Sequence, residues 1–352
     1  MRKRLRVNLL SALKSAGVFD RLRDSRWRRR HLLILCYHSL AIADENLWRP
    51  ALFLAPSRLR ERFEILKQGG YHILPLGEAL ERLHRNDLPP RAVVLTFDDG
   101  TYDFYKLAYP LLKEYGFPAT VYQTTHYCSR RMPIYSLICS YMLWKKRDSL
   151  LSAAPPIGIA SDVRLDSPEN RQTALDQIVA FADREQLSSD EKNDLAADLA
   201  LRLGVDYDEL LRRRIVQLMN REEIAELASA GISFELHTHR HRTPRDQALF
   251  LGEIQDNRDA LEAITKTRPT HFCYPSGNHD SIFLSWLAEE GIVSATTCDP
   301  GLASMRSNPL LVPRFVDTTA QTVLEFESWL TGLGALLSTG ANAARLRRLA
   351  GS

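Results

Sequence analysis

Short apolar runs alternate with helix-like segments along most of this 352-residue chain. Runs such as Leu32–Leu35 and Ala92–Leu95 have the length of buried strands, whereas Arg58–Gln68 has the apolar spacing of an amphipathic helix. A strand–helix unit that recurs over more than about 200 residues predicts either a β/α barrel or a doubly wound parallel sheet. No GxGxxG motif follows the first strand, which argues against a dinucleotide-binding sheet.

Polar residues at the ends of the predicted strands favour the barrel. They are His38, Asp98, Asp99, His237 and the turn Tyr274–Gly277. A β/α barrel builds its active site from the carboxyl ends of its strands, so we expect these residues to lie near one another. The fold class that we predict is therefore α/β, with the strands closed into a barrel.

Asp98 and Asp99 come where the strand that begins at Ala92 must end, because Gly100 supplies a turn directly after them. Two neighbouring carboxylates at a buried strand end need a compensating cation. A bound metal is the simplest one, since one carboxylate can ligate it while the other stays free for proton transfer. The alternative is that both acids cap the helix that begins near Thr101.

A second cluster, His237-Thr238-His239-Arg240-His241, also follows a predicted strand. His237 and His241 are four residues apart, so a helical turn at the strand end would aim both imidazoles at one point. Two imidazoles and one carboxylate leave the open position that a catalytic metal requires. A solvated loop is the alternative for the histidines alone. Together with the adjacent carboxylates, they predict a divalent metal site.

These two motifs carry a resemblance to a known family. Thr96-Phe97-Asp98-Asp99-Gly100 and His237-Thr238-x-x-His241 resemble the paired motifs of the polysaccharide deacetylase family, also called the NodB homology domain or carbohydrate esterase family 4. The resemblance covers roughly residues 31–320 and implies a distorted (β/α) barrel with fewer than eight regular units. It further implies that Asp99, His237 and His241 bind a divalent metal, most often Zn2+, and that Asp98 is the general base.

The third family motif is altered in this chain. Phe272–Gly277 resembles the family's Arg-Pro-Pro-Tyr-Gly turn, whose tyrosine backbone N–H helps to hold the oxyanion. When the two are aligned on their proline and glycine, Ser276 replaces that tyrosine, and Cys273 replaces the arginine that orients the base. Arg314, near the end of a strand predicted for Leu310–Phe315, is our candidate for this orienting role, with an ordinary surface arginine as the alternative. The turn residues expected to serve the substrate or the oxyanion are Tyr274, Pro275, Ser276 and Gly277.

The family's general acid is a histidine near the C-terminus, and this chain has no histidine after His279. Tyr37-His38 instead resembles a permuted subset that includes the poly-β-1,6-N-acetylglucosamine deacetylases, in which the acid histidine precedes the Asp-Asp motif. The resemblance therefore implies that His38 is the general acid. The alternative is a buried histidine bonded to a carbonyl group.

The formal net charge of +3 is unevenly distributed, because residues 1–30 hold many more basic than acidic residues. Apolar residues lie between them at a roughly helical spacing. This arm is either a terminal helix docked on the body, which we favour, or a peripheral attachment to an anionic membrane surface. It lacks a secretory h-region, so we expect a cytoplasmic protein, either free or held at the inner face of the membrane. Nothing supports nucleic-acid binding beyond charge.

The domain organisation that we predict has three parts. Residues 1–30 form the basic amphipathic arm, residues 31–320 form the barrel with a helical insertion at about 128–215, and residues 321–352 form a helical tail. Five scattered cysteines without CxxC spacing argue against a disulfide framework and favour reduced thiols.

The function predicted from these features is removal of N-acetyl groups from amino sugars by a metal-dependent hydrolase. The substrate class is an oligo- or polysaccharide or a lipid-linked glycan precursor. Two alternatives remain at this point. One is an amidase or deformylase that acts on a small non-sugar amide, and the other is a catalytically silent glycan-binding protein that has kept the metal site.

Overall fold

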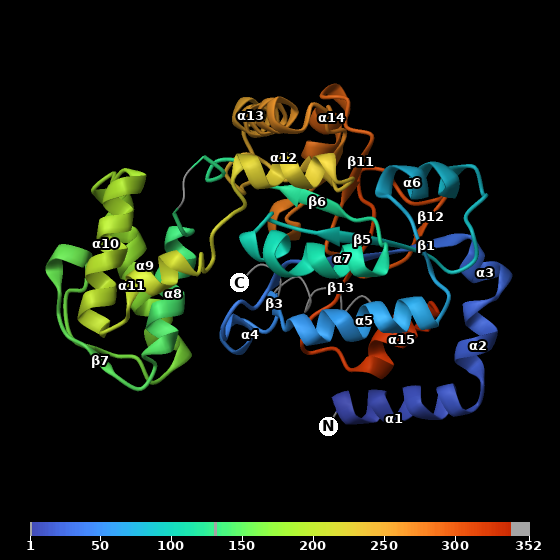
Figure 1. The fold of residues 1–352 in the computed structure, drawn as a ribbon, viewed down its shortest axis with the longest axis horizontal. Coiled ribbons are helices and arrows are strands. Elements are labelled where there is room, and N and C mark those ends of the chain that lie inside the picture. The colour runs from blue at the N-terminus through green and yellow to red at the C-terminus, as the bar shows by residue number, and fades with distance from the viewer. Residues whose placement is uncertain (1, 130–131, 339–352) are drawn as a thin grey trace. The chain divides into compact units, whose positions relative to one another are not determined.

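The computed structural model describes residues 2–129 and 132–338. The chain folds into two compact units (Figure 1). One unit contains the chain up to His126 together with the chain from Arg221 onward, and the other is Tyr127–Asn220. All the residues predicted to act in catalysis or metal binding belong to the first unit.

The first unit is built on a curled, mainly parallel sheet. The strand order is β11-β10-β9-β6-β5-β1-β12, with β4 beside β5 and β13 beside β1. The described pairings between these strands are parallel, except that β1 and β12 are antiparallel. The strands are β1 (His31–Tyr37), β4 (His72–Ile73), β5 (Ala92–Phe97), β6 (Thr120–Gln123), β9 (Ser233–Leu236), β10 (His271–Cys273), β11 (Ser294–Thr296), β12 (Ala303–Ser304) and β13 (Phe315–Val316).

One short segment runs between β11, at one edge of this sheet, and β1, which lies next to the other edge strand. Val312 forms a parallel bridge with Thr296 of β11, and Phe315 of β13 pairs with Leu35 of β1. The prediction of a strand over Leu310–Phe315 is therefore wrong in its extent. Pro313, which has no N–H to donate, interrupts the ladder. The predicted distorted barrel is confirmed, and this irregular seam is part of its distortion.

Helices cover the sheet on both sides, which explains why β1 and β5 are buried along nearly their whole length. In Figure 1, α12, α13 and α14 lie above the sheet, and α5 and α15 lie below it. The helices are α5 (Pro56–Gln68), α6 (Leu76–His84), α7 (Tyr109–Tyr115) with a preceding π-helix (Phe104–Ala108), α12 (Arg221–Ser229), α13 (Gln247–Thr265), α14 (Ile282–Glu289) and α15 (Val323–Leu330).

The basic N-terminal arm is helical and lies against the body of the first unit. It consists of α1 (Arg2–Ser15), α2 (Val18–Arg23) and α3 (Arg26–Arg29), and Leu10 and Phe19 pack on Leu333 of α16 (Leu333–Leu336). Arg28 is buried and donates hydrogen bonds to three backbone carbonyl oxygens, those of Leu330, His31 and Ala92. Burial lowers the pKa of Arg28 to about 10, so the guanidinium remains charged at neutral pH.

In the described part of the chain, no helix is both long and apolar enough to span a bilayer.

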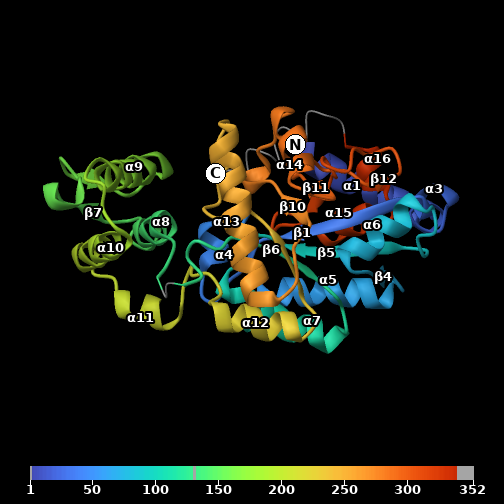
Figure 2. The same ribbon diagram turned by 90° about the horizontal axis from the view of Figure 1, so that it is seen from above.

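The second unit is mainly helical and occupies the region predicted to be an insertion. Its helices are α8 (Tyr135–Lys145), α9 (Pro168–Arg184), α10 (Ser189–Leu203) and α11 (Tyr207–Arg212), and a two-stranded ribbon joins β7 (Leu150–Leu151) to β8 (Val163–Arg164). Ser188 and Glu191 form a capping box at the start of α10, which satisfies backbone donors that a helix N-terminus leaves unpaired. Figure 2 shows the same elements from above.

Candidate active site

Asp98 directly follows β5 and forms a buried ion pair with Arg314. The two terminal nitrogens of Arg314 each lie 2.7 Å from one carboxylate oxygen of Asp98. Burial opposes ionisation of this carboxyl, but the adjacent guanidinium outweighs it and holds the pKa of Asp98 below its usual range. Asp98 is thus an ionised, oriented carboxylate at neutral pH.

The other hydrogen-bond donors of Arg314 are also occupied. Its Nε donates to the carbonyl oxygen of Thr297 at 3.0 Å, and its terminal nitrogens also donate to Thr96 Oγ1 at 3.1 Å and Cys273 Sγ at 3.0 Å. With the two bonds to Asp98, these contacts account for all five N–H groups of a guanidinium. Arg314 is fully buried, which differs from an ordinary surface arginine.

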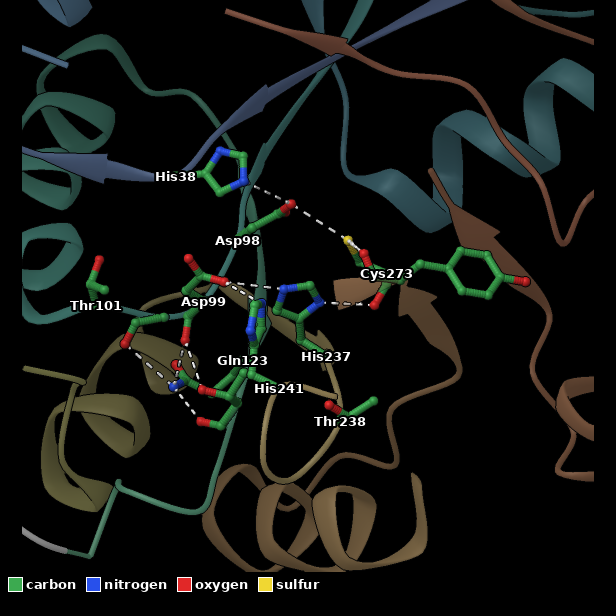
Figure 3. Close-up of polar contacts among 12 residues, drawn as sticks. His38, Asp98, Asp99, Thr101, Gln123, His237, Thr238, His241 and Cys273 are labelled. Atoms are coloured by element: carbon green, nitrogen blue, oxygen red, sulfur yellow. Dashed lines mark hydrogen bonds and ion pairs between the residues drawn. The ribbon is translucent and has the colours of Figure 1, made fainter. Parts of the chain in front are cut away.

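The turn that carries Asp99 is clamped by two residues at the end of β6. Asp99 has a φ of 70° and Gly100 a φ of 74°, so both lie in the left-handed region. Gln123 Nε2 donates to the carbonyl oxygen of Gly100 at 3.3 Å, and Thr124 Oγ1 donates to that of Asp99 at 3.2 Å (Figure 3). A Cβ at position 100 would overlap the Gln123 side chain, which explains why glycine occupies this turn.

Asp99 faces two imidazoles. Its Oδ1 lies 3.2 Å from Nε2 of His237 and 3.2 Å from Nε2 of His241 (Figure 3). The Nδ1 of His237 is 2.8 Å from the carbonyl oxygen of Cys273, which can only accept, so Nδ1 carries a hydrogen and Nε2 is the nitrogen that faces Asp99. These three groups form a candidate metal cluster of one carboxylate oxygen and two imidazole nitrogens. This donor set fits a catalytic divalent metal.

The backbone that brings the two histidines together is not helical. The prediction of a helical turn at the end of β9 is wrong, because residues 237–241 form a loop in which Thr238 and His241 have φ values of 61° and 56°. Thr238 Oγ1 accepts a hydrogen bond from the backbone N–H of Arg242 at 3.0 Å, which fixes this loop. The left-handed residues redirect the chain so that both imidazoles reach Asp99.

His38 lies on the side of Asp98 away from His241 (Figure 3). Its Nε2 is 3.9 Å from Oδ2 of Asp98. The chain after His38 is held by a hydrogen bond from the backbone N–H of Leu40 to Asp103 and by a contact between the hydroxyls of Ser39 and Thr101. The imidazole is therefore close to the carboxylate predicted to act as the base.

The Tyr274–Gly277 turn follows β10. Tyr274 is fully buried, and its hydroxyl donates a hydrogen bond to the carbonyl oxygen of Leu310 at 3.0 Å. The N–H groups of Tyr274 and Gly277 donate to backbone carbonyls, and Pro275 has no N–H. Ser276, with a φ of 55°, therefore provides the candidate oxyanion N–H of this turn.

Asn257 of α13 supports the site although the sequence did not single it out. Its Oδ1 accepts a hydrogen bond from the backbone N–H of His237 at 2.9 Å, and its Nδ2 donates to the carbonyl oxygen of Gln123 at 3.0 Å and to Thr125 Oγ1 at 2.9 Å. The available signal was its position: Asn257 interrupts the buried apolar stripe of α13. A polar residue on such a stripe needs partners, and here they are the ends of β6 and β9.

Comparisons with known proteins agree with this geometry. A family model described as polysaccharide deacetylase matches residues 85–147 and 207–295. In these two segments the chain is similar to the polysaccharide deacetylase family. The matched segments contain Asp98, Asp99 and both candidate histidine ligands, whereas His38 and Arg314 lie outside them. The family is divalent-metal dependent, and the cluster around Asp99 supplies candidate ligands.

One curated relative is the poly-beta-1,6-N-acetyl-D-glucosamine N-deacetylase of Escherichia coli (strain K12). It is 33% identical over 100 residues, which are 28% of this chain and 14% of the relative. The deacetylase PplD of Streptococcus pyogenes, solved in complex with acetate, has a TM-score of 0.56 and 20% identity over 86% of this chain and 97% of its own. IcaB from Ammonifex degensii has a TM-score of 0.50 and 16% identity over 92% and 97%. These two likenesses show a common fold.

Proposed function

We propose that this chain is a metal-dependent hydrolase that removes N-acetyl groups from amino sugars of an oligo- or polysaccharide or a lipid-linked glycan precursor. The observation that supports the proposal most is that two adjacent carboxylates have different partners. Asp98 is paired with Arg314 and Asp99 faces two imidazoles. The match to the polysaccharide deacetylase family model, together with a relative named as a poly-beta-1,6-N-acetyl-D-glucosamine N-deacetylase, supports the substrate class.

Asp99, His237 and His241 are the residues proposed to hold the metal. Their two imidazole nitrogens and one carboxylate oxygen are a donor set typical of catalytic zinc, so Zn2+ is the proposed ion. When bound, such an ion polarises a carbonyl oxygen and lowers the pKa of a coordinated water. The hydrogen bond from His237 Nδ1 to Cys273 keeps this imidazole in the tautomer that a metal ligand needs.

The remaining groups handle protons and charge in the hydrolysis. Asp98 accepts a proton from water as the water oxygen bonds to the acetyl carbon, and Arg314 keeps the carboxylate ionised and fixed in its plane. The N–H of Ser276 donates to the oxyanion, a contribution that is typically worth about 3 kcal/mol per donor. His38 gives a proton to the amine nitrogen as the C–N bond breaks, so that acetate and a free amino sugar leave.

Acetate release from N-acetylglucosamine oligomers by the zinc-loaded protein tests this proposal, with Asp98→Asn as the matched variant. Release that depends on both zinc and Asp98 supports the deacetylase. The same samples are assayed for formate and ammonia release from small amides, which separates the amidase alternative. If zinc binds through Asp99, His237 and His241 but no acetylated glycan is cleaved, the proposed reaction is wrong.

We further propose that the protein is cytoplasmic and that the exposed face of its docked N-terminal arm attaches it peripherally to an anionic membrane surface. Leu5 and Leu9 of α1 are 63% and 50% exposed and one helical turn apart, and Arg4, which precedes Leu5, is also exposed. Apolar and basic side chains together favour the interface of an anionic bilayer. The Leu5→Glu/Leu9→Glu double variant should sediment less than the wild type with vesicles that contain phosphatidylserine, and equal sedimentation contradicts the proposal.

A further inference from the structure

Two histidines outside the candidate metal cluster face each other. The Nδ1 of His126 and the Nε2 of His239 are 3.4 Å apart, and the two rings are nearly perpendicular, at 82°. His126 follows β6 and His239 follows β9, and both side chains are half-buried. His239 lies between His237 and His241 in the chain, but its ring contacts the imidazole of His126.

Backbone hydrogen bonds hold this pair in place. The N–H groups of Thr125 and His126 both donate to the carbonyl oxygen of His239, at 3.3 Å and 2.9 Å. The N–H of His239 in turn donates to the carbonyl oxygen of Glu253 at 3.0 Å. Both imidazoles therefore stand on segments that are tied directly to one another, so their separation does not depend on loose loops.

The second nitrogen of His239 is also engaged. Its Nδ1 lies 2.8 Å from Thr125 Oγ1, and this hydroxyl accepts a hydrogen bond from Nδ2 of Asn257 at 2.9 Å. A histidine that ligates a metal through one nitrogen usually donates a hydrogen bond from the other, which fixes the ring and its tautomer. Thr125 is placed to receive that bond from His239.

The distance between the two facing nitrogens identifies the kind of ligand. Hydrogen bonds from N–H groups in proteins are typically about 2.7–3.2 Å long, which is shorter than the 3.4 Å observed. Two imidazole nitrogens bound at about 2.0–2.1 Å to one tetrahedral ion lie about 3.3–3.4 Å apart. The spacing therefore fits two imidazoles that share one metal ion.

We propose that His126 and His239 form a second transition-metal site, which takes Zn2+ or Cu2+ through Nδ1 of His126 and Nε2 of His239. Imidazole suits both ions, and water fills the remaining coordination positions because both side chains are only half-buried. With two protein ligands, this site binds zinc more weakly than the cluster of Asp99, His237 and His241. The proposal does not require that the chain be a deacetylase.

Calorimetric titration of the metal-free full-length protein with zinc tests the assignment. We expect the wild type to bind two equivalents, the second more weakly than the first. His126→Gln and His239→Gln should each lose the weaker event, while His72→Gln, which changes an exposed histidine, should keep both. Asp99→Asn should lose the tight event and keep the weak one, so that failure at either site is recognised separately.

A spectroscopic measurement keeps the proposal testable if the glutamine variants do not fold. Cu2+ added to a His237→Ala/His241→Ala protein, which lacks both imidazoles of the first cluster, should give an electron paramagnetic resonance spectrum with coupling to two imidazole nitrogens. A wild type that binds a single zinc equivalent overturns the second site. So does a folded His126→Gln or His239→Gln protein that keeps both binding events, or a copper spectrum without coupling to two nitrogens.

Discussion

Asp98 and Asp99 are neighbours in the chain, yet their carboxylates have different partners. Both oxygens of Asp98 lie 2.7 Å from Arg314, whereas Oδ1 of Asp99 lies 3.2 Å from two imidazole nitrogens. The left-handed backbone at Asp99 gives its side chain a direction different from that of Asp98. The two acids can therefore be tested for separate roles by matched substitutions.

Asp98→Asn and Asp99→Asn should fail in different ways. Asp98→Asn keeps all three proposed metal ligands, so it should bind one tight zinc equivalent while its kcat falls by about 10²–10⁴, the usual contribution of a general base. Asp99→Asn should lose the tight zinc. Zinc content and kcat measured on the same preparations check this, and loss of zinc in Asp98→Asn would show that the roles are assigned wrongly.

Arg314→Met should disturb both stability and the pH dependence of activity. Removing one partner of a buried ion pair lowers the free energy of unfolding by about 3–5 kcal/mol. Without the guanidinium, the pKa of Asp98 rises, so the base is protonated at higher pH and the acidic limb of the kcat/KM profile moves upward. A pH–rate series with urea unfolding measures both effects. Arg60→Met, at an exposed pair with Glu114, is the control and should change neither.

His38→Gln should slow amide hydrolysis much more than aryl-ester hydrolysis. A departing amine must gain a proton, whereas a nitrophenolate leaves without one, so only the amide needs the proposed acid. We expect kcat for an N-acetylated sugar to fall by about 10²–10⁴ and kcat for 4-nitrophenyl acetate to change little. Equal losses on both substrates would assign His38 a structural role.

Glu235→Gln should stabilise the protein at alkaline pH. Burial raises the pKa of Glu235 to about 7, although its Oε2 accepts backbone hydrogen bonds from Thr270 and His271. Between about pH 4.5 and 7 the folded state binds more protons than the unfolded state, so the Glu235 contribution to stability is lost as pH rises. Glutamine stays neutral and can still accept both bonds. We expect the variant to be about 1–3 kcal/mol more stable at pH 8 and unchanged at pH 4.5.

Urea unfolding at both pH values measures this difference. The exposed Glu64→Gln substitution is the matched control, and its stability should not depend on pH in this way. An Asp or Glu elsewhere that titrates over the same range affects both proteins equally and cancels in the comparison. If Glu235→Gln is less stable than the wild type at pH 8, the ionised carboxylate is favoured in the folded state and the argument fails.

The sequence predicted the barrel and the strand-end residues because burial follows local patterns of apolar residues. It did not predict the loop conformation of residues 237–241, since spacing alone does not distinguish a helical turn from a loop with left-handed residues. The partners of Arg314, among them Thr96 and Cys273, come from distant strands and leave no local signal. The roles of Asp98, His38 and Arg314 themselves stay predictions for the experiments above.

The left-handed backbone at Asp99, Thr238, His241 and Ser276 sets a limit on engineering this protein. This conformation costs a non-glycine residue roughly 1 kcal/mol or more, so glycine or asparagine at such positions relieves strain. Laboratory evolution for heat resistance alone should therefore enrich glycine at the very positions that carry the proposed metal ligands. A thermostable variant of this chain is best selected for heat resistance and zinc retention together, because selection for heat resistance alone favours replacement of the proposed zinc ligands.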